Sequence, residues 1–403
     1  MTANLVILKM IAVTLGPVGM GVLGNFMSLT TMISVFSGGG IATGITKYVA
    51  EYKSRPKRLI EFIGSAFAFG SLFSAIFLFG TLVFSKQISL ALFGSDEFYW
   101  LILTIGIAQI VCFFGTAVVS VANGLNRQDI FAIVTIVGYT IAIPIAFVLI
   151  STNGISGAAI ALLVVASAAG VPAIYFAMRS PITRLIRIEL NKYDTNRLMR
   201  YSLMALVSAL VFPLVEISIR TLIIELLGHG DAGLWQAMTR LSGAYLGLFT
   251  LYLSTTYMPL LSALNERALV SRTVLGNLLR VGIVFSVFSL LVYFLKEDIV
   301  IALYSPEFIG VSGIVLWYLI GDLFRICSYV IGFLGVAKAA LKLYVFCELF
   351  QAISLVGLSY FTLRGGGKLI DVAQAYALAY FLYFIMMLFA FGQYRRGAYD
   401  FSR

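Results

Sequence analysis

Runs of mostly apolar residues, each long enough to cross a bilayer, follow one another along nearly the whole chain. Of the 403 residues, 61% are hydrophobic and only 11% are charged, whereas charged residues make up about 25% of a soluble domain. A soluble fold of this size could not bury so much apolar surface, so most of the chain must face lipid. The runs are too long, and alternate too little, for the strands of a membrane barrel. The sequence therefore predicts an all-α polytopic membrane protein.

We count twelve candidate spans joined by short connections, several of which contain turn residues such as Gly16-Pro17 and Asn153-Gly154. The expected spans are roughly 3–22, 23–46, 61–84, 99–122, 130–151, 156–178, 201–227, 233–261, 274–295, 310–337, 343–363 and 371–392. The sequence thus predicts about twelve transmembrane helices.

The basic residues are distributed unequally between the two sides of these spans. Nineteen of the 28 lie in the connections after even-numbered spans or at the C-terminus, and only four lie in the opposite connections. Because basic connections stay in the cytoplasm, both termini are expected there. The formal net charge of +10 then reflects mostly topology, and it gives no reason to expect nucleic acid as a partner.

The two halves of the chain resemble each other at a spacing near 212 residues. The matches at that spacing pair Leu15-Gly16, Gly21 and Leu29 with Leu227-Gly228, Gly233 and Leu241. Six spans in each half is an even number, so both halves enter the membrane from the same side, and the repeat is parallel. We therefore expect an N-terminal six-helix bundle over 1–180, a basic cytoplasmic linker over 181–200, and a C-terminal six-helix bundle with a short tail over 201–403. Substrate would bind between the bundles.

Five basic residues remain inside the spans, namely Lys9, Arg220, Arg240, Arg280 and Arg325. A charge at the bilayer centre costs about 3 kcal/mol on insertion scales, so each needs a partner or water. Two pairs share a helix face, Glu216 with Arg220 and Asp322 with Arg325. Each pair could neutralise itself for folding, or the arginines could line a wet cavity and bind phosphate, for which the guanidinium fork is suited. The sequence leaves both interpretations open.

The remaining charges inside spans also have two interpretations each. Arg240 has no acidic residue three or four positions away, which favours an anion-binding role. Lys9 could bind the same anion or extend to the interface from the short first span. Glu348 could titrate or form a hydrogen bond between helices, and with Glu216 and Asp322 it is a candidate for ion coupling. Arg280 is expected to extend to the cytoplasmic interface.

Trp235 and Gln236 lie near the outer end of a span and are compatible with sugar stacking, although Trp is also an interfacial anchor. With one His, and three Cys without CxxC spacing, no metal site or cofactor is expected. Gly39 and Gly44 have phosphate-loop spacing, but Ile45 stands where Lys is required. Since no nucleotide-binding domain fits in the chain, we expect a secondary transporter.

Several segments resemble Wzx-type flippases of the multidrug/oligosaccharidyl-lipid/polysaccharide (MOP) superfamily. These segments are LGPVGMGVLGNF at 15–26, SGGGIATGITKYVAEY at 37–52, GLWQAMTRLSGAYL at 233–246, IGDLFRICSYVIGFLGVAKAALKLYVFCELFQ at 320–351 and AQAYALAYFLYF at 373–384. The resemblance covers nearly the whole chain. It is greatest to the branch that flips lipid III of enterobacterial common antigen, and the O-antigen translocases are adjacent.

The resemblance implies a MATE-like (MOP-like) inner-membrane protein that has two six-helix bundles around a cationic cavity and no enzymatic activity. It implies transport of an undecaprenyl-pyrophosphate-linked oligosaccharide, either lipid III or an O-antigen repeat unit, to the periplasmic leaflet by alternating access. A polymerase and a chain-length regulator of the same pathway are the partners it suggests. Residues of the same type as in the lipid III branch are Lys9, Asn25, Lys47, Arg220, Trp235, Gln236, Asp322, Lys338 and Glu348.

The resemblance also adds detail to the site. Asn25 joins Trp235 and Gln236 as a candidate sugar contact. Arg325 stands where that branch is expected to carry Lys, so the charge is kept but the geometry differs. Glu216 and Arg240 fall where the branch looks uncharged, which suggests roles particular to this protein's substrate.

Two other function classes remain as alternatives. A MATE-like drug or cation antiporter would need acids to outnumber bases inside the spans, and here the bases are at least as numerous. A membrane-embedded glycosyltransferase or polymerase would need a large periplasmic loop for its chemistry, and no connection is long enough. Both alternatives are therefore less favoured than a flippase.

Overall fold

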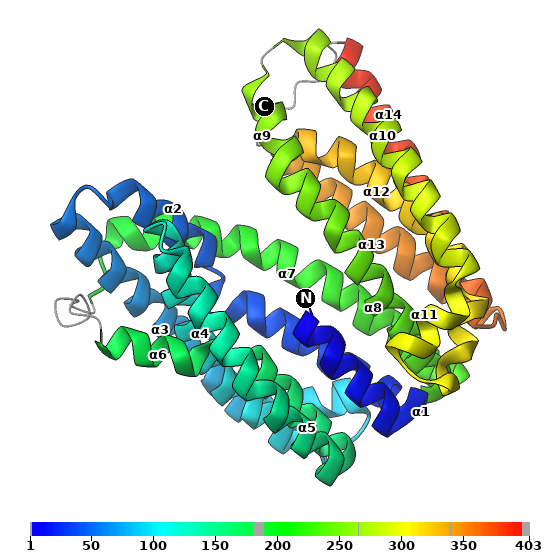
Figure 1. Ribbon diagram of the computed structural model, residues 1–403, viewed down its shortest axis with the longest axis horizontal. Coiled ribbons are helices and arrows are strands. Elements are labelled where there is room, and N and C mark those ends of the chain that lie inside the picture. Colours follow the sequence, from blue (N-terminus) through cyan, green and yellow to red (C-terminus); the bar gives the residue numbers. More distant parts are fainter. Residues whose placement is uncertain (1, 180–188, 265, 338–340, 397–403) are drawn as a thin grey trace. The chain divides into compact units, whose positions relative to one another are not determined.

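The computed structural model describes residues 2–179, 189–264, 266–337 and 341–396. Within these ranges the regular structure is entirely helical (Figure 1), which confirms the predicted all-α class. Eight helices of the described chain are long and apolar enough to cross a membrane. The count of twelve spans stays a prediction. Lys338 and the first part of the expected linker lie outside the described residues.

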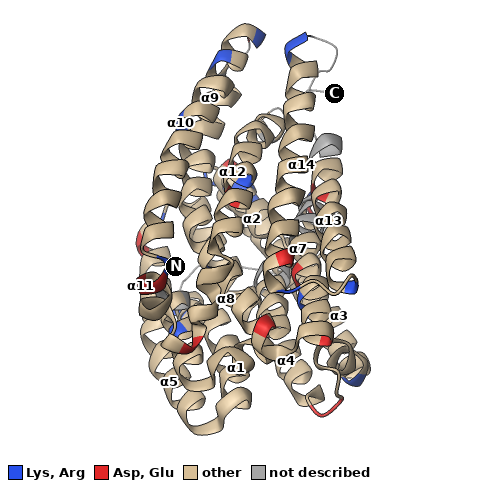
Figure 2. Ribbon diagram, turned by 90° about the vertical axis from the view of Figure 1, so that its right-hand side faces the viewer, with Lys and Arg blue, Asp and Glu red and all other residues tan. Residues whose placement is uncertain are grey.

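The helices form two compact units. The N-terminal unit comprises Thr2–Leu15 and Val22–Ile217, and the C-terminal unit comprises Gly16–Gly21 and Ser218–Arg403. The boundary near 217 falls within a continuous helix, so one helix begins in the first unit and ends in the second. Figure 2 shows long helical stretches without charged residues, as apolar membrane spans require.

The N-terminal unit is built around α4 (Tyr99–Gly124), which packs against four other helices of the unit. Those helices are α2 (Ala42–Tyr52), α3 (Pro56–Phe93), α5 (Gln128–Ala166) and α6 (Gly170–Arg179). The remaining elements are α1 (Thr2–Phe36), the 3-10 turn η1 (Ser37–Gly39) and the first part of α7 (Lys192–Leu227). Aromatic residues fill the core near α2, where Tyr48 and Tyr52 both pack edge-on against Phe62.

Glycines set the position of the turn between α1 and α2. Gly38, Gly39 and Gly40 all have positive φ, a conformation that L side chains rarely adopt. A Cβ on Gly38 would lie 2.1 Å from the ring of Phe113 on α4, so the turn packs directly on that ring. The glycine-rich segment that looks like a phosphate loop is therefore a buried structural turn.

The structure corrects the expected boundaries of the first two spans, 3–22 and 23–46. Helix α1 is broken at Gly16, which has φ 60° and ψ −169°, and the chain next turns at 37–39. Pro17 follows the break and begins the second helical segment, where its missing N–H is not needed. Gly16-Pro17 and the Ser-Gly-Gly-Gly run at 37–40 mark these turns in the sequence, but the span limits expected from hydropathy run through both. A similar break at Gly154 divides α5 between the two spans expected there.

The C-terminal unit is built around α12 (Val315–Ala337), which packs against α8 (His229–Tyr252), α10 (Arg267–Phe294), α13 (Leu341–Arg364) and α14 (Leu369–Arg396). Its smaller elements are the π-helical segment η3 (Leu253–Tyr257), α9 (Met258–Ala263), α11 (Lys296–Leu303) and the 3-10 segment η4 (Pro306–Gly313). The end of α7 and residues 16–21 complete the unit.

The glycines matched between the two halves occupy equivalent places in the structure. Gly228 has φ 94° and ψ 173° and separates α7 from α8, much as Gly16 divides α1. A Cβ on Gly21 would lie 2.0 Å from the carbonyl oxygen of His229, and one on Gly233 would lie 1.8 Å from that of Pro17. At the spacing of 212, His229 is the counterpart of Pro17 and Gly233 is the counterpart of Gly21. The two contacts are therefore reciprocal, because Gly21 contacts His229 and Gly233 contacts Pro17.

A buried ion pair joins the start of α7 to α3 within the N-terminal unit. The Asp194 side chain is fully buried and pairs with the Arg58 guanidinium, which also stacks on the ring of Tyr52. Removing one partner of a buried pair leaves an uncompensated charge and costs about 3–5 kcal/mol. We therefore expect Arg58→Ala to lower the thermal unfolding midpoint in detergent strongly. Arg55→Ala, at an exposed neighbouring position, is the control, and equal effects of the two would contradict the prediction.

Candidate functional site

A buried carboxylate in α12 lies at the centre of the C-terminal unit. Asp322 is 0% exposed and accepts hydrogen bonds from three hydroxyl groups, those of Ser242, Tyr245 and Tyr376. Ser242 and Tyr245 are three residues apart and so share one face of α8, while Tyr376 comes from α14. Three helices thus converge on one carboxylate, which the hydrogen bonds stabilise against the cost of burial.

Arg325 lies one turn further along α12 and is joined to Asp322 through a tyrosine. The Tyr376 hydroxyl donates to Asp322 Oδ1 at 2.6 Å and accepts from Arg325 Nη1 at 3.2 Å. Arg325 Nε donates to the hydroxyl of Tyr329 at 2.9 Å, and the guanidinium lies 5.1 Å from the centre of the Tyr380 ring. The side chain is partly exposed. A guanidinium has five N–H donors in a fixed fork, so this group can bind tyrosines and a phosphate oxygen together.

Stacked aromatic rings support this charge pair. Tyr318 stacks on Tyr376 with ring centres 4.3 Å apart, and Trp235 packs edge-on against both rings. A Cβ on Gly321 would lie 2.6 Å from the Tyr376 ring, so the glycine before Asp322 allows that tyrosine to approach α12. Trp235 is 3% exposed. The residue considered for sugar stacking is therefore part of the packed wall behind the charge pair.

Arg220 and Gln236 meet across the break between α7 and α8. Both side chains are 0% exposed, and Arg220 Nη2 donates to the amide oxygen of Gln236. Arg240, one turn further along α8 from Gln236, is partly exposed. Among the described side chains, no carboxylate lies within ion-pair distance of Arg240. Arg240 therefore combines access with positive charge, whereas Arg220 is enclosed.

Three of the candidates expected from the sequence belong to the N-terminal unit. Ser28 donates a 2.8 Å hydrogen bond to Glu216, and both side chains are buried. Asn25 is also buried and donates to the carbonyl oxygen of Leu92 at 3.0 Å. Lys9 is exposed on the first segment of α1. In the C-terminal unit, Glu348 is partly exposed on α13. The structure thus brings together Asp322, Arg325 and Trp235, and separately Arg220 and Gln236.

The tyrosines and Ser242 were not selected by sequence reasoning. The signal available was spacing, since Ser242 and Tyr245, Arg325 and Tyr329, and Tyr376 and Tyr380 are each three or four residues apart. That signal is weak in a chain with 21 tyrosines. In the described part of the chain, no group of three or more His, Cys, Asp or Glu residues could hold a metal ion.

A family model described as "Polysaccharide biosynthesis protein" matches residues 1–265 of the chain. The chain belongs to this family. The lipid III flippases of Escherichia coli (strain K12) and Shigella flexneri are each 29% identical to this chain over 399 residues. The match covers 98% of this chain and 95% of each relative. The resemblance to polysaccharide flippases expected from the sequence is confirmed at the level of the family.

Solved structures of a multidrug transporter and of a lipid flippase have a similar fold. An inward-facing multidrug resistance MATE transporter of the MOP superfamily superimposes with a TM-score of 0.78 at 12% identity, covering 98% of this chain and 95% of that one. The lipid II flippase MurJ, in an inward closed conformation, gives a TM-score of 0.74 at 16% identity, covering 96% and 85%. At these identities the likeness concerns the fold, and it confirms the MATE/MOP-like class.

Proposed function

We propose that this polysaccharide biosynthesis family protein is a flippase that moves an undecaprenyl-pyrophosphate-linked oligosaccharide from the cytoplasmic to the periplasmic leaflet. The observation that carries the proposal is the match to lipid III flippases over 98% of the chain. The cargo is either lipid III or an O-antigen repeat unit. No catalytic step is part of this proposal, because the relatives are named flippases and transporters.

The chemistry of the C-terminal unit fits such a cargo. A pyrophosphate esterified at both ends is a dianion, and carrying it through hydrocarbon requires compensating positive charge. Arg325 and Arg240 are partly exposed, and Arg325 lies on α12, one of the helices long and apolar enough to cross a membrane. We assign phosphate contacts to these two residues. Arg220 is enclosed beside Gln236 and supports the α7–α8 junction, and Lys9 remains a candidate from the N-terminal unit.

Asp322, Glu216 and Glu348 are the candidates for ion coupling, and the first of these has the clearest environment. Both Asp322 oxygens accept hydrogen bonds from hydroxyls. When such a carboxylate is protonated, it can change its hydrogen-bond partners. Because the Tyr376 hydroxyl also contacts Arg325, protonation of Asp322 would change the hydrogen bonding of Arg325 at the proposed phosphate site. Asn25, Trp235 and Gln236 are buried, so as sugar contacts they would act only in a more open state.

Transport by alternating access is supported by the fold relatives, which include both inward-facing and outward-facing conformations. We further propose two six-helix bundles joined by the basic linker, both termini in the cytoplasm of a bacterium, and cooperation with a polymerase and a chain-length regulator of the same pathway.

Complementation tests the proposed cargo. An Escherichia coli strain that lacks its lipid III flippase is expected to regain surface common antigen when it produces this protein. If only a strain lacking an O-antigen translocase is rescued, the cargo is the O-antigen repeat unit. Failure in both strains, with the protein present in the membrane, would contradict the proposal.

A drug or cation antiporter is the alternative, because the fold is shared with multidrug transporters. Two observations disfavour binding of a cationic drug at the Asp322 carboxylate. The carboxylate lies near the positive charge of Arg325, and its oxygens already accept hydrogen bonds from hydroxyl groups. Resistance to cationic drugs, measured with and without the protein, distinguishes the two functions. Unchanged resistance together with restored surface polysaccharide is the outcome expected of a flippase.

The orientation can be tested by labelling single cysteines. The three native cysteines are buried, so labelling of introduced ones can be read against a low background. We expect Ser54→Cys, between α2 and α3, to react in whole cells only with a membrane-permeant maleimide. Asp96→Cys, between α3 and α4, is expected to react with an impermeant one. The reverse pattern would overturn the proposed topology.

A further inference from the structure

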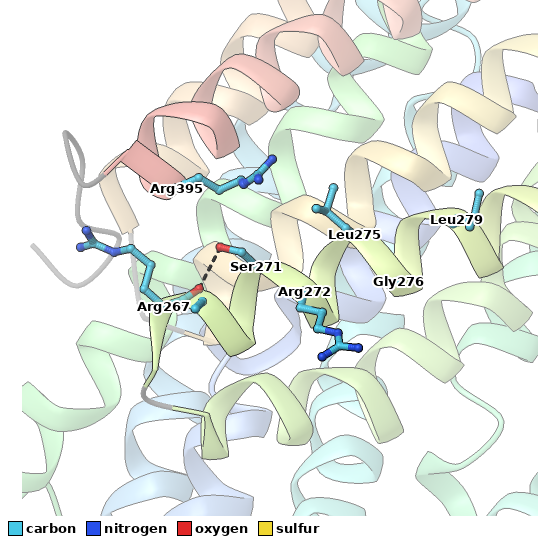
Figure 3. A pocket seen from close by; sticks show the side chains of 8 residues that line it. Arg267, Ser271, Arg272, Leu275, Gly276, Leu279 and Arg395 are labelled. Carbon is cyan, nitrogen blue, oxygen red and sulfur yellow. Dashed lines mark hydrogen bonds between the residues drawn. The ribbon is translucent and has the colours of Figure 1, made fainter.

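A basic groove lies at one end of the C-terminal unit, between the start of α10 and the end of α14. It has a volume of about 780 Å³, and Figure 3 shows the side chains that line it. Its lining comprises Arg267, Ala268, Ser271, Arg272, Leu275, Gly276, Leu279 and Arg395. Neither the charge pair at Asp322 nor the arginines assigned to the cargo line it, so the groove is separate from the proposed transport site.

Three arginines form the rim of the groove, and no acidic residue is part of its lining. Arg267 and Arg272 come from the first turns of α10, and Arg395 from the last turn of α14. Figure 3 shows the Arg395 side chain extending from α14 alongside α10, whereas the guanidinium groups of Arg267 and Arg272 point to different sides of α10. The guanidinium of Arg267 lies 5.3 Å from the ring centre of Tyr394. This rim is suited to an anion with several oxygen acceptors, such as a phosphate.

The groove becomes apolar as it follows α10 away from its basic end. Leu275 and Leu279 are 40% and 65% exposed. Between them, a Cβ on Gly276 would meet no atom within 4 Å, so the glycine leaves open space. An isolated phosphate would use only the rim, whereas an amphiphile with a phosphate head and a hydrocarbon tail would use the whole groove.

The length of α10 indicates where the groove lies relative to the bilayer. A helix of 28 residues is about 42 Å long, whereas the hydrocarbon core is about 30 Å thick. The surplus must project into the headgroup region, and the end that carries Arg267 and Arg272 is the charged one. The rim then lies at headgroup depth, and Leu275 and Leu279 lie at the edge of the hydrocarbon.

We propose that this groove is a binding site for an anionic phospholipid of the adjacent leaflet. Its phosphate is bound when the exposed side chains of Arg267, Arg272 and Arg395 turn toward it, and an acyl chain lies along Leu275, Gly276 and Leu279. Each basic residue near an anionic membrane surface strengthens binding about fivefold. Loss of all three arginines should therefore weaken binding roughly a hundredfold.

Lipid retention measured by native mass spectrometry tests the site. Purified full-length protein is titrated with phosphatidylglycerol, with phosphatidylcholine, and with inorganic phosphate. We expect retention of phosphatidylglycerol alone, and a roughly hundredfold weaker affinity when the three arginines are replaced together by Gln. Equal retention of the zwitterionic lipid, or competition by inorganic phosphate at similar concentration, would overturn the assignment.

Matched variants separate a built site from general surface charge. Arg395→Gln should reduce retention about fivefold, whereas Arg396→Gln, on the same turn but outside the lining, should leave it unchanged. Gly276→Leu adds an apolar side chain to the lining of the groove and removes no charge, and a Cβ there meets no atom within 4 Å, so it should abolish retention while the protein still folds. Its control is Gly357→Leu on α13, where a Cβ also has open space. Equal loss in Arg396→Gln, or full retention in Gly276→Leu, contradicts the proposal.

Discussion

Replacement of Arg325 by alanine is expected to abolish restoration of surface polysaccharide while the protein remains in the membrane at its normal level. A hydrogen bond from a charged donor contributes about 1.5–3 kcal/mol, so losing even one such bond to the pyrophosphate would slow transport roughly tenfold or more. Arg325→Lys keeps the charge but loses the fork that reaches both Tyr329 and Tyr376, so it should retain only part of the activity. Surface polysaccharide is measured by antibody binding, and protein level by immunoblot.

A second variant distinguishes anion binding from simple neutralisation of Asp322. Because Asp322 is itself a candidate for ion coupling, Arg325→Ala combined with Asp322→Asn is compared with Asp322→Asn alone. If Arg325 only balanced the buried carboxylate, the double variant would transport as well as Asp322→Asn. If Arg325 binds the pyrophosphate, the double variant should transport less than Asp322→Asn alone. The control is Arg280→Ala, which removes an exposed arginine of α10 and should be tolerated. Normal polysaccharide with Arg325→Ala would exclude a role in the cargo site.

The same residues show how far the sequence could predict this site. The sequence identifies Asp322 and Arg325 because a charge inside an apolar span costs free energy, so it needs a partner, water or a functional role. Their joining through the Tyr376 hydroxyl could not be predicted, because it depends on how α12 and α14 pack. For Trp235 the position near the end of a span suggests an anchor at the membrane interface. In the structure its ring is instead buried against Tyr318.

For the fold, the sequence predicts the helical class better than the boundaries of the helices. Helical class follows from apolar length, because lipid leaves the backbone few ways to satisfy its hydrogen bonds. Boundaries depend on single glycines: the turn residues Gly16-Pro17 and Asn153-Gly154 mark the breaks at Gly16 and Gly154, whereas the turn at 37–39 falls inside the span expected over 23–46. The internal match at a spacing near 212 was more informative, because it marked Gly16 and Gly228, both of which adopt positive φ.

The reciprocal contact between Gly21 and the start of α8 gives the largest expected effect on folding. We expect Gly233→Leu to prevent accumulation of folded protein, and Gly21→Ala to lower it severely. In both cases the new Cβ would lie about 2 Å from a backbone carbonyl oxygen, and a backbone atom cannot move aside as a side chain can. Fluorescence-detected size exclusion of the detergent-solubilised protein measures the folded fraction.

A glycine elsewhere on α8 provides the comparison. Gly243→Ala adds the same methyl group to the same helix, but a Cβ there meets nothing within 4 Å. It should be neutral or stabilising by up to about 1 kcal/mol, since Ala favours the helix over Gly. Because the two contacts are reciprocal, Gly21→Ala and Gly233→Ala should cause losses of similar size, and the double variant should be less than additive. Full accumulation of Gly233→Leu would show that the two segments do not approach each other as closely as the 1.8 Å value requires.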